Sequence, residues 1–421
     1  MLELSLATRD IFHALGTADF RHLWLGTLAS SFAMNMQLVA RGWYVYELTE
    51  SALHLALVLL SFTVPQVTLS LLGGVVADRF PKRGILTVGQ LLNGLAALAM
   101  GYLVFSGNVR FSHFIVFGVL SGTILALSFP SRHAIVPNLV RDHLVFSAIA
   151  LNSTAMNIAR VAGPAFAGLL IAWIAGGNTS SDVGVGIVYF VIAGLYIAAS
   201  IVTWTISVSG SVEIQQTVRY VLTDMLEVLR FVRRHPSVWA LVWLAVIPFM
   251  FGHTLNTFLP AFNEDVINGG ADSLGLLLSF MGIGAILGSL TLATASNLRR
   301  KGAWLIAMVV TWGLAVAVFG LMHNSISALA LVTVIGWLSS SSMAMNRALT
   351  QMHTRDRMLG RVMSIDMMSH GLMPISAIPI GILADTVGTA FAISTSGVLL
   401  MLIVTLMLFA SPSVRHLSKP D

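Results

Sequence analysis

The sequence contains no cysteine in its 421 residues, which excludes disulfide bonds, thiol catalysis and zinc sites with cysteine ligands. Charge is also scarce, because Asp, Glu, Lys and Arg together make up only 10% of the chain. Soluble proteins carry about 25% of these residues, which they need to cover a surface that faces water. Much of the folded surface must therefore face a medium other than water.

Motifs of the common enzyme classes are missing as well. The chain has no G-x-x-x-x-G-K-[ST] segment for ATP, no H-E-x-x-H zinc motif and no G-x-S-x-G segment around a nucleophilic serine. Its histidines are scattered without the spacing of metal ligands. We therefore expect a protein that is not an enzyme and that holds neither a cofactor nor a metal.

Hydrophobic residues, in contrast, make up 56% of the chain and fall into long runs. A membrane-spanning helix needs about 20 such residues. Twelve runs meet this requirement, which predicts an all-α integral membrane protein with twelve transmembrane helices. The predicted helices are 23–46, 52–77, 84–106, 112–136, 146–175, 184–207, 237–260, 273–296, 303–322, 327–350, 360–384 and 388–410.

One connection is long and polar. Residues 208–236 carry apolar side chains at helical spacing and charged residues on the other face, which predicts an amphipathic helix on the membrane surface. This linker would join two bundles of six helices. The predicted division is a cytoplasmic N-terminal segment 1–22, an N-terminal bundle 23–207, the linker 208–236, a C-terminal bundle 237–410 and a cytoplasmic tail 411–421.

The basic residues predict the orientation in the membrane. With a cytoplasmic N-terminus, only Arg110 of the 23 Lys and Arg residues falls in an outer loop, and Arg41 and Arg160 fall within helices. The remaining 20 lie on or near the inner side, as the positive-inside rule requires. We expect a multi-pass protein of the inner (plasma) membrane with both termini in the cytoplasm. Basic residues in such short loops indicate topology and do not indicate binding to nucleic acid.

The two halves of the chain resemble each other. Trp24 and Trp239, Arg132 and Arg347, and Pro164 and Pro379 recur at an offset of 215 residues. The segment Leu-Leu-Ser-Phe occurs at 59–62 and again at 277–280. Matches in this order at nearly constant offset indicate a duplicated six-helix half, which is a common plan among transporters.

A charged motif connects the second and third predicted helices. The segment 74–83 reads GVVADRFPKR and resembles the G-x-x-x-D-R-x-x-R-R loop of the major facilitator superfamily, with Lys82 in place of the first terminal Arg. The resemblance implies two pseudo-symmetric six-helix bundles, close helix packing at Gly74, and a gating role for Asp78 on the cytoplasmic side. A basic loop that only sets topology is the alternative. The candidate gating residues are Gly74, Asp78, Arg79, Lys82, Arg83 and Arg132.

A second signature narrows the resemblance. The segments 129–140 (FPSRHAIVPNLV) and 40–49 (ARGWYVYELT) are similar to the branch that contains enterobactin exporter-like proteins, the transmembrane secretion effectors. Within the first segment, Arg132 could pair with Asp78 or could simply be a positive-inside residue. On the fifth predicted helix, Gly163, Pro164 and Gly168 look like part of the antiporter motif and suit close helix packing.

The resemblance also suggests which residues face a central cavity, because helices one, four, seven and ten line it in this superfamily. Arg160, near mid-membrane, either holds an anionic group or satisfies backbone carbonyls. Asp366 and His370 lie four residues apart, so they share a helical face and could carry a proton, although Asp366 could instead pair with a nearby arginine. The candidate cavity residues are Asn35, Gln37, Arg41, Arg160, His253, Asn256 and Asn346.

Together these features predict a secondary active transporter. We expect proton-coupled efflux of a small amphiphilic molecule, such as a siderophore, drug or metabolite, by alternating access of a monomer in the lipid bilayer. An importer or a lysolipid flippase of the same fold is the alternative. A membrane-embedded enzyme or a receptor that does not transport is a more distant one.

Overall fold

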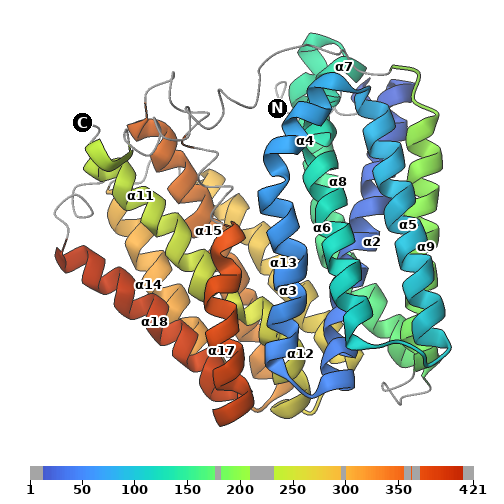
Figure 1. Ribbon diagram of the computed structural model, residues 1–421. Coiled ribbons are helices and arrows are strands. Elements are labelled where there is room, and N and C mark those ends of the chain that lie inside the picture. Colours follow the sequence, from blue (N-terminus) through green and yellow to red (C-terminus); the bar gives the residue numbers. More distant parts are fainter. Residues whose placement is uncertain are drawn as a thin grey trace. The chain divides into compact units, whose positions relative to one another are not determined.

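The computed structural model describes residues 13–175, 182–208, 232–294, 300–354, 362 and 370–410. All regular structure in these ranges is helical (Figure 1). The helices of the N-terminal half are α2 (Ala18–Thr49), α3 (Ala52–Thr68), α4 (Ser70–Arg79), α5 (Lys82–Phe105), α6 (Phe111–Ala134), α7 (Val136–Leu139), the short 3₁₀ helix η1 (Asp142–Leu144), α8 (Val145–Ile174) and α9 (Asp182–Trp204).

The helices of the C-terminal half follow the same plan. They are α11 (Pro236–Ile247), the π-helix η2 (Pro248–Gly252), α12 (Thr254–Asp265), α13 (Ala271–Thr294), α14 (Lys301–Phe319), α15 (Ser325–His353), the 3₁₀ helix η3 (His370–Leu372), α17 (Met373–Val387) and α18 (Thr389–Ala410). The segments α11, η2 and α12 together occupy the seventh predicted helix. Pro248, which lacks a backbone N–H, begins the π-helix and explains why the α-helix is interrupted there.

Most of these helices can cross a bilayer. In the described part of the chain, nine helices are long and apolar enough, or ten if α3 and α4, bent by 55°, form one span. The chain is therefore a multi-pass membrane protein. The remaining two predicted segments are occupied by α2, which includes Arg41 and Glu47, and by α17, which has only 15 residues. The number of twelve spans stays a prediction.

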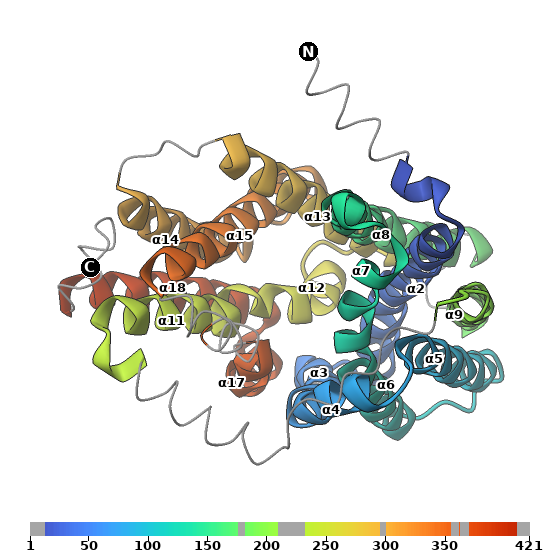
Figure 2. The same cartoon turned by 90° about the horizontal axis from the view of Figure 1, so that it is seen from above.

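The chain forms two compact units. Unit 1 comprises Met1–Tyr44 and Ser61–Val218, and unit 2 comprises Val45–Leu60 and Arg219–Asp421. Within unit 1, α5 packs along α9, and within unit 2, α13 packs along α15 and α14 along α18 (Figure 2). Most of the predicted amphipathic linker, most of the segment 1–22 and the tail 411–421 lie outside the described residues. The predicted division into bundles therefore stays a prediction.

Glycines allow the closest helix contacts, and these contacts recur in both units. A Cβ atom at Gly122 of α6 would lie 2.1 Å from the carbonyl oxygen of Phe62, and one at Gly336 of α15 would lie 2.1 Å from that of Met281. Gly73 and Gly288 face the carbonyl oxygens of Ala126 and Trp337 in the same way, at 2.1 and 2.4 Å. Such spacing requires glycine. The recurrence agrees with the internal repeat in the sequence.

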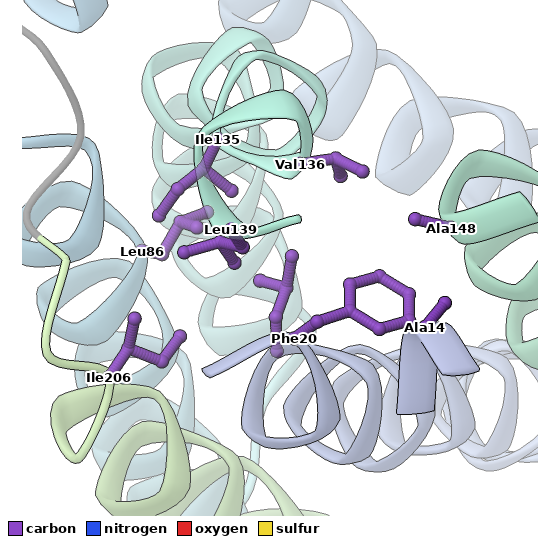
Figure 3. Packing of buried hydrophobic residues seen from close by; sticks show 9 residues of the cluster. Ala14, Phe20, Leu86, Ile135, Val136, Leu139, Ala148 and Ile206 are labelled. Carbon is purple, nitrogen blue, oxygen red and sulfur yellow. The ribbon is translucent and has the colours of Figure 1, made fainter. Parts of the chain in front are cut away.

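A hydrophobic cluster surrounds α7 in unit 1 (Figure 3). Phe20 of α2 packs there with Leu86 of α5 and with Ile135, Val136 and Leu139 around α7. The short helix α7 is thus held by its apolar side chains. Three residues of the 129–140 signature, Ile135, Val136 and Leu139, therefore pack α7 against α2 and α5.

Candidate functional site

Arg132 occupies a polar cavity inside unit 1. The cavity has a volume of about 30 Å³, which is room for one or two water molecules. One guanidinium nitrogen of Arg132 lies 3.5 Å from the hydroxyl oxygen of Ser30 on α2, a long hydrogen bond. The cavity is lined by Ser30, Met34, Leu86, Gly89, Gln90, Asn93, Leu125, Ser128, Arg132 and Tyr196.

Some polar groups that line this cavity lack a hydrogen-bond partner or a counter-ion among the described residues. The side-chain oxygen of Gln90, a residue only 7% exposed, has no hydrogen-bond partner among the described residues. None of the described lining residues is acidic, and no ion pair joins Arg132 to Asp78 or to any other carboxylate in the part of the chain that the structure describes. The Arg132 charge is therefore available to water or to a polar group of a ligand.

A second arginine lies in the interior of the same unit. The guanidinium of Arg41, on α2, lies over the Phe62 ring at 5.7 Å from its centroid, which is a cation–π contact. The phenols of Tyr189 and Tyr196, on α9, lie near the Arg41 guanidinium. Tyr196 also lines the cavity that holds Arg132. Two interior cations thus share aromatic and phenolic surroundings.

The predicted gating motif lies at the junction of α4 and α5. Asp78 and Arg79 are exposed at the end of α4, and Lys82 is buried at the start of α5. Arg83 donates a 2.6 Å hydrogen bond to the backbone oxygen of Ile206 and lies over the Trp204 ring. Arg83 thus fastens α5 to the end of α9. A gating role for these residues remains a prediction.

The two glycines of this motif differ in their surroundings. A Cβ atom at Gly74 would meet nothing within 4 Å, whereas the adjacent Gly73 faces the backbone of Ala126. The close approach that the motif suggested for Gly74 therefore takes place at Gly73.

The packing motif on α8 contacts α2. A Cβ atom at Gly163 would lie 2.8 Å from the Cβ of Asn35, and Pro164 and Gly168 are buried. Asn35 donates a 2.8 Å hydrogen bond to the backbone oxygen of Ser31 on its own helix. Arg160, one turn before Gly163, is exposed on α8. Gln37, the remaining candidate on α2, is buried.

The candidates of unit 2 gather around the π-helix. The His253 ring stacks on Phe249 at 4.7 Å between centroids and meets the edge of Trp312 at 5.1 Å. The side-chain nitrogen of Asn256 lies 3.4 Å from Nδ1 of His253. Asn346, which is 4% exposed, lines a cavity of about 10 Å³ with Pro248, Phe249 and Ser342 among other residues. These side chains lie in aromatic and apolar packing.

The predicted proton pair cannot be placed. Asp366 lies outside the described residues, and so does the side chain of His370, whose backbone begins η3. Sequence reasoning passed over two other carboxylates, Asp265 and Asp385. Asp265 ends α12 and Asp385 lies in the last turn of α17, positions where a carboxylate usually signals only solvent exposure. Their partners lie 124 or more residues away along the chain.

Two compact helical units with polar residues inside their spans are features of many secondary transporters. The family model described as "Transmembrane secretion effector" matches residues 11–418. The chain therefore belongs to the transmembrane secretion effector family of the major facilitator superfamily. It is a transporter and not an enzyme.

Relatives of similar length carry transporter names. The staphyloferrin A transporter of Staphylococcus aureus is 24% identical over 395 residues, which cover 93% of this chain and 94% of the relative. The enterobactin exporter EntS of Escherichia coli (strain K12) is 24% identical, and the match covers 99% of this chain and 95% of the relative. The multidrug efflux pump Tap of Mycolicibacterium fortuitum is 24% identical, and the match covers 93% of this chain and 96% of the relative.

Solved structures agree on the fold. The nucleoside transporter NupG matches with a TM-score of 0.70 at 13% identity, covering 96% of this chain and 100% of that one. A bacterial homologue of the human lysosomal transporter Spinster, in an inward-facing and unoccupied conformation, matches with a TM-score of 0.71 at 13% identity, covering 95% and 96%. The major facilitator fold predicted from the sequence is therefore confirmed.

Proposed function

We propose that this protein is a proton-coupled exporter of a small amphiphilic molecule, such as a siderophore, a drug or another metabolite. It works by alternating access as a monomer in the inner (plasma) membrane, with both termini in the cytoplasm. The efflux names of two relatives and the siderophore names of two support the substrate class. The excess of Lys and Arg in the predicted inner loops supports the orientation.

The observation that carries the proposal is the pair of interior arginines in unit 1. Arginine is rare within spanning segments, because its charge is costly to bury in lipid, and such residues often mark substrate or ion paths. Arg41 lies within α2, and Arg132 lies in the last turn of α6. Arg132 faces a polar cavity, and Arg41 faces phenols and Phe62. Neither charge is neutralised by a carboxylate among the described residues. A polar, electron-rich group of the substrate would supply the missing partner.

Flux in membrane vesicles tests the function. In inside-out vesicles with an acidic lumen, protons leaving the lumen should drive a labelled substrate inward, and a protonophore should abolish this uptake. A panel of siderophores, drugs and lysolipids identifies the substrate. Uptake that ignores the pH gradient would contradict proton coupling, and the absence of uptake for every compound would contradict efflux of this class.

The gating motif gives a separate prediction. Replacing Asp78 by Asn should lower the rate of vesicle transport by about tenfold while the amount of protein in the membrane stays unchanged, because the charge that fastens the cytoplasmic side is lost. Asp142→Asn is the control, since Asp142 is equally exposed and lies in the helix η1 outside the motif. Equal transport by both variants and the wild type would remove the gating role.

A further inference from the structure

The cavity that holds Arg132 is small and lies within one unit. Its lining residues, on α2, α5, α6 and α9, all belong to unit 1. Its volume of about 30 Å³ compares with about 300–1,000 Å³ for the pockets of drug-sized ligands. A whole siderophore or drug is therefore too large for it. Only water, a small ion or one end group of a larger molecule fits.

The Arg132 guanidinium has more donors than partners. A guanidinium carries five N–H donors and no acceptor. Among the described residues, its one hydrogen bond is the 3.5 Å contact with the hydroxyl oxygen of Ser30. Ser30 itself donates to the backbone oxygen of Thr27, so its own oxygen acts as the acceptor for Arg132. Most of the Arg132 donors are therefore left for water or a ligand in the cavity.

Two buried side chains of the lining add donors to the same space. Tyr196 and Gln90 are each 7% exposed, and neither forms a hydrogen bond with a described residue. The Tyr196 hydroxyl can donate one hydrogen bond, and a half-turn of the Gln90 amide presents its two N–H donors in place of its oxygen. Asn93, which is half-buried, carries a second amide. Buried polar groups without partners are costly, so these donors indicate a ligand that accepts hydrogen bonds.

The charge around the cavity has one sign. Arg132 is the only charged side chain in the described lining, and it forms no ion pair with a described carboxylate. Arg132 lies in the last turn of α6, where the backbone carbonyls of a helix together carry about half a negative charge. These carbonyls offset only part of the cation. A second cation would be repelled from the cavity, whereas an anion would complete the neutralisation of Arg132.

The apolar part of the lining favours a compact ion. Met34, Leu86 and Leu125 form part of the wall and offer no N–H or O–H donor. A cavity with room for one or two water molecules can hold a monatomic halide, but it is too small for a phosphate or sulfate with four oxygens. A halide also accepts hydrogen bonds from any direction, which matches donors that come from the three helices α5, α6 and α9.

We propose that the Arg132 cavity is a binding site for one small inorganic anion, chloride being the common biological one. The Arg132 guanidinium, the Tyr196 hydroxyl and the amides of Gln90 and Asn93 donate to the ion, which neutralises Arg132 when no substrate is present. Binding of the ion does not depend on transport. A consequence that rests on the export function proposed above is that a polar group of the substrate displaces the ion, so chloride and substrate compete.

Thermal unfolding of the purified protein tests anion binding. The wild type in detergent is heated in sodium chloride, sodium bromide or sodium gluconate at equal ionic strength, because gluconate is too large for the cavity. A ligand that binds only the folded state raises the midpoint of unfolding as its concentration rises. Chloride and bromide should raise this midpoint above the gluconate value by at least about 2 °C, with an effect that depends on halide concentration.

Three variants assign the effect to the cavity. Arg132→Gln should lose the response to halide, because the charge is gone. Tyr196→Phe keeps the ring and removes one donor, so the halide concentration for half of the effect should rise about tenfold. Arg141→Gln is the matched control, since it removes the same charge from an exposed arginine outside the cavity, and it should respond like the wild type.

Two results would overturn the anion site. Equal halide responses in Arg132→Gln and the wild type would identify a nonspecific salt effect, and equal midpoints of the wild type in chloride and gluconate would show no binding. If Arg132→Gln yields no monodisperse protein, Tyr196→Phe decides by the same comparison, because it changes neither the charge nor the aromatic ring.

The unfolding experiment separates this inference from the proposed function, because it uses no substrate. A protein that binds halide but exports no compound of the panel would contradict the export proposal and support the site. A protein that exports, but whose midpoint ignores halide, would contradict the site alone. In an exporting protein, replacing gluconate by chloride should raise the substrate concentration that gives half-maximal flux, and an unchanged concentration would contradict the competition.

Discussion

The Gly122→Ala variant is expected to yield much less folded protein than the wild type. The added methyl group would lie 2.1 Å from the carbonyl oxygen and 2.9 Å from the carbonyl carbon of Phe62, and backbone atoms cannot turn aside as a side chain can. The helices α3 and α6 would have to separate, at a cost of about 1–3 kcal/mol or more. The yield of monodisperse protein after size-exclusion chromatography, and its midpoint of thermal unfolding, should both fall.

Gly194→Ala is the matched substitution for this test. Gly194 lies inside the spanning helix α9, and a Cβ atom there would meet nothing within 4 Å. Alanine favours a helix over glycine by about 1 kcal/mol, so this variant should be neutral or slightly more stable. Comparable stability of the two variants would mean that α3 and α6 do not approach as closely as the structure has them.

Arg132→Gln is expected to reduce vesicle transport by at least about tenfold while the protein still folds. The substitution keeps polar atoms in the cavity with Ser30 and Gln90 but removes the charge, which is the property that a polar group of the substrate would recognise. Arg132→Lys should retain part of the transport, because it restores the charge without the planar fork of donors.

Arg141→Gln separates this role from the topological alternative. Arg141 is exposed in the segment before η1, on the same predicted side of the membrane. If Arg132 served only as a positive-inside residue, Arg132→Gln and Arg141→Gln would change transport to the same extent, and Arg132→Lys would transport like the wild type. Loss of transport in Arg132→Gln alone would support the substrate path through unit 1.

Helix positions were largely predictable from the sequence. The predicted segments 84–106 and 388–410 correspond to α5 at Lys82–Phe105 and to α18 at Thr389–Ala410. Bilayer thickness fixes the length of an apolar run, so composition alone places such helices. The π-helix Pro248–Gly252 was not predicted, because an interruption within an apolar run leaves the hydrophobic pattern unchanged.

Side-chain partners were much less predictable. Arg132 and Arg41 could be predicted because a charge inside an apolar run stands out. The tyrosines of α9 near them could not, because tyrosine is common in such runs. The contact of Tyr46 with Asp265 joins residues 219 positions apart, and that of Ser51 with Asp385 joins residues 334 apart. Nothing in the spacing of residues along one helix encodes such pairs, because the packing of helices brings them together.

A counterflow experiment tests the central claim of transport by alternating access most directly. Proteoliposomes are loaded with a high concentration of unlabelled substrate and diluted into a trace of the labelled compound, with no pH gradient. A carrier that exposes one site to each side in turn must exchange the two pools, so the label should accumulate transiently above its external concentration. A label that only equilibrates, without this overshoot, would identify a channel-like or non-transporting protein and would contradict the account.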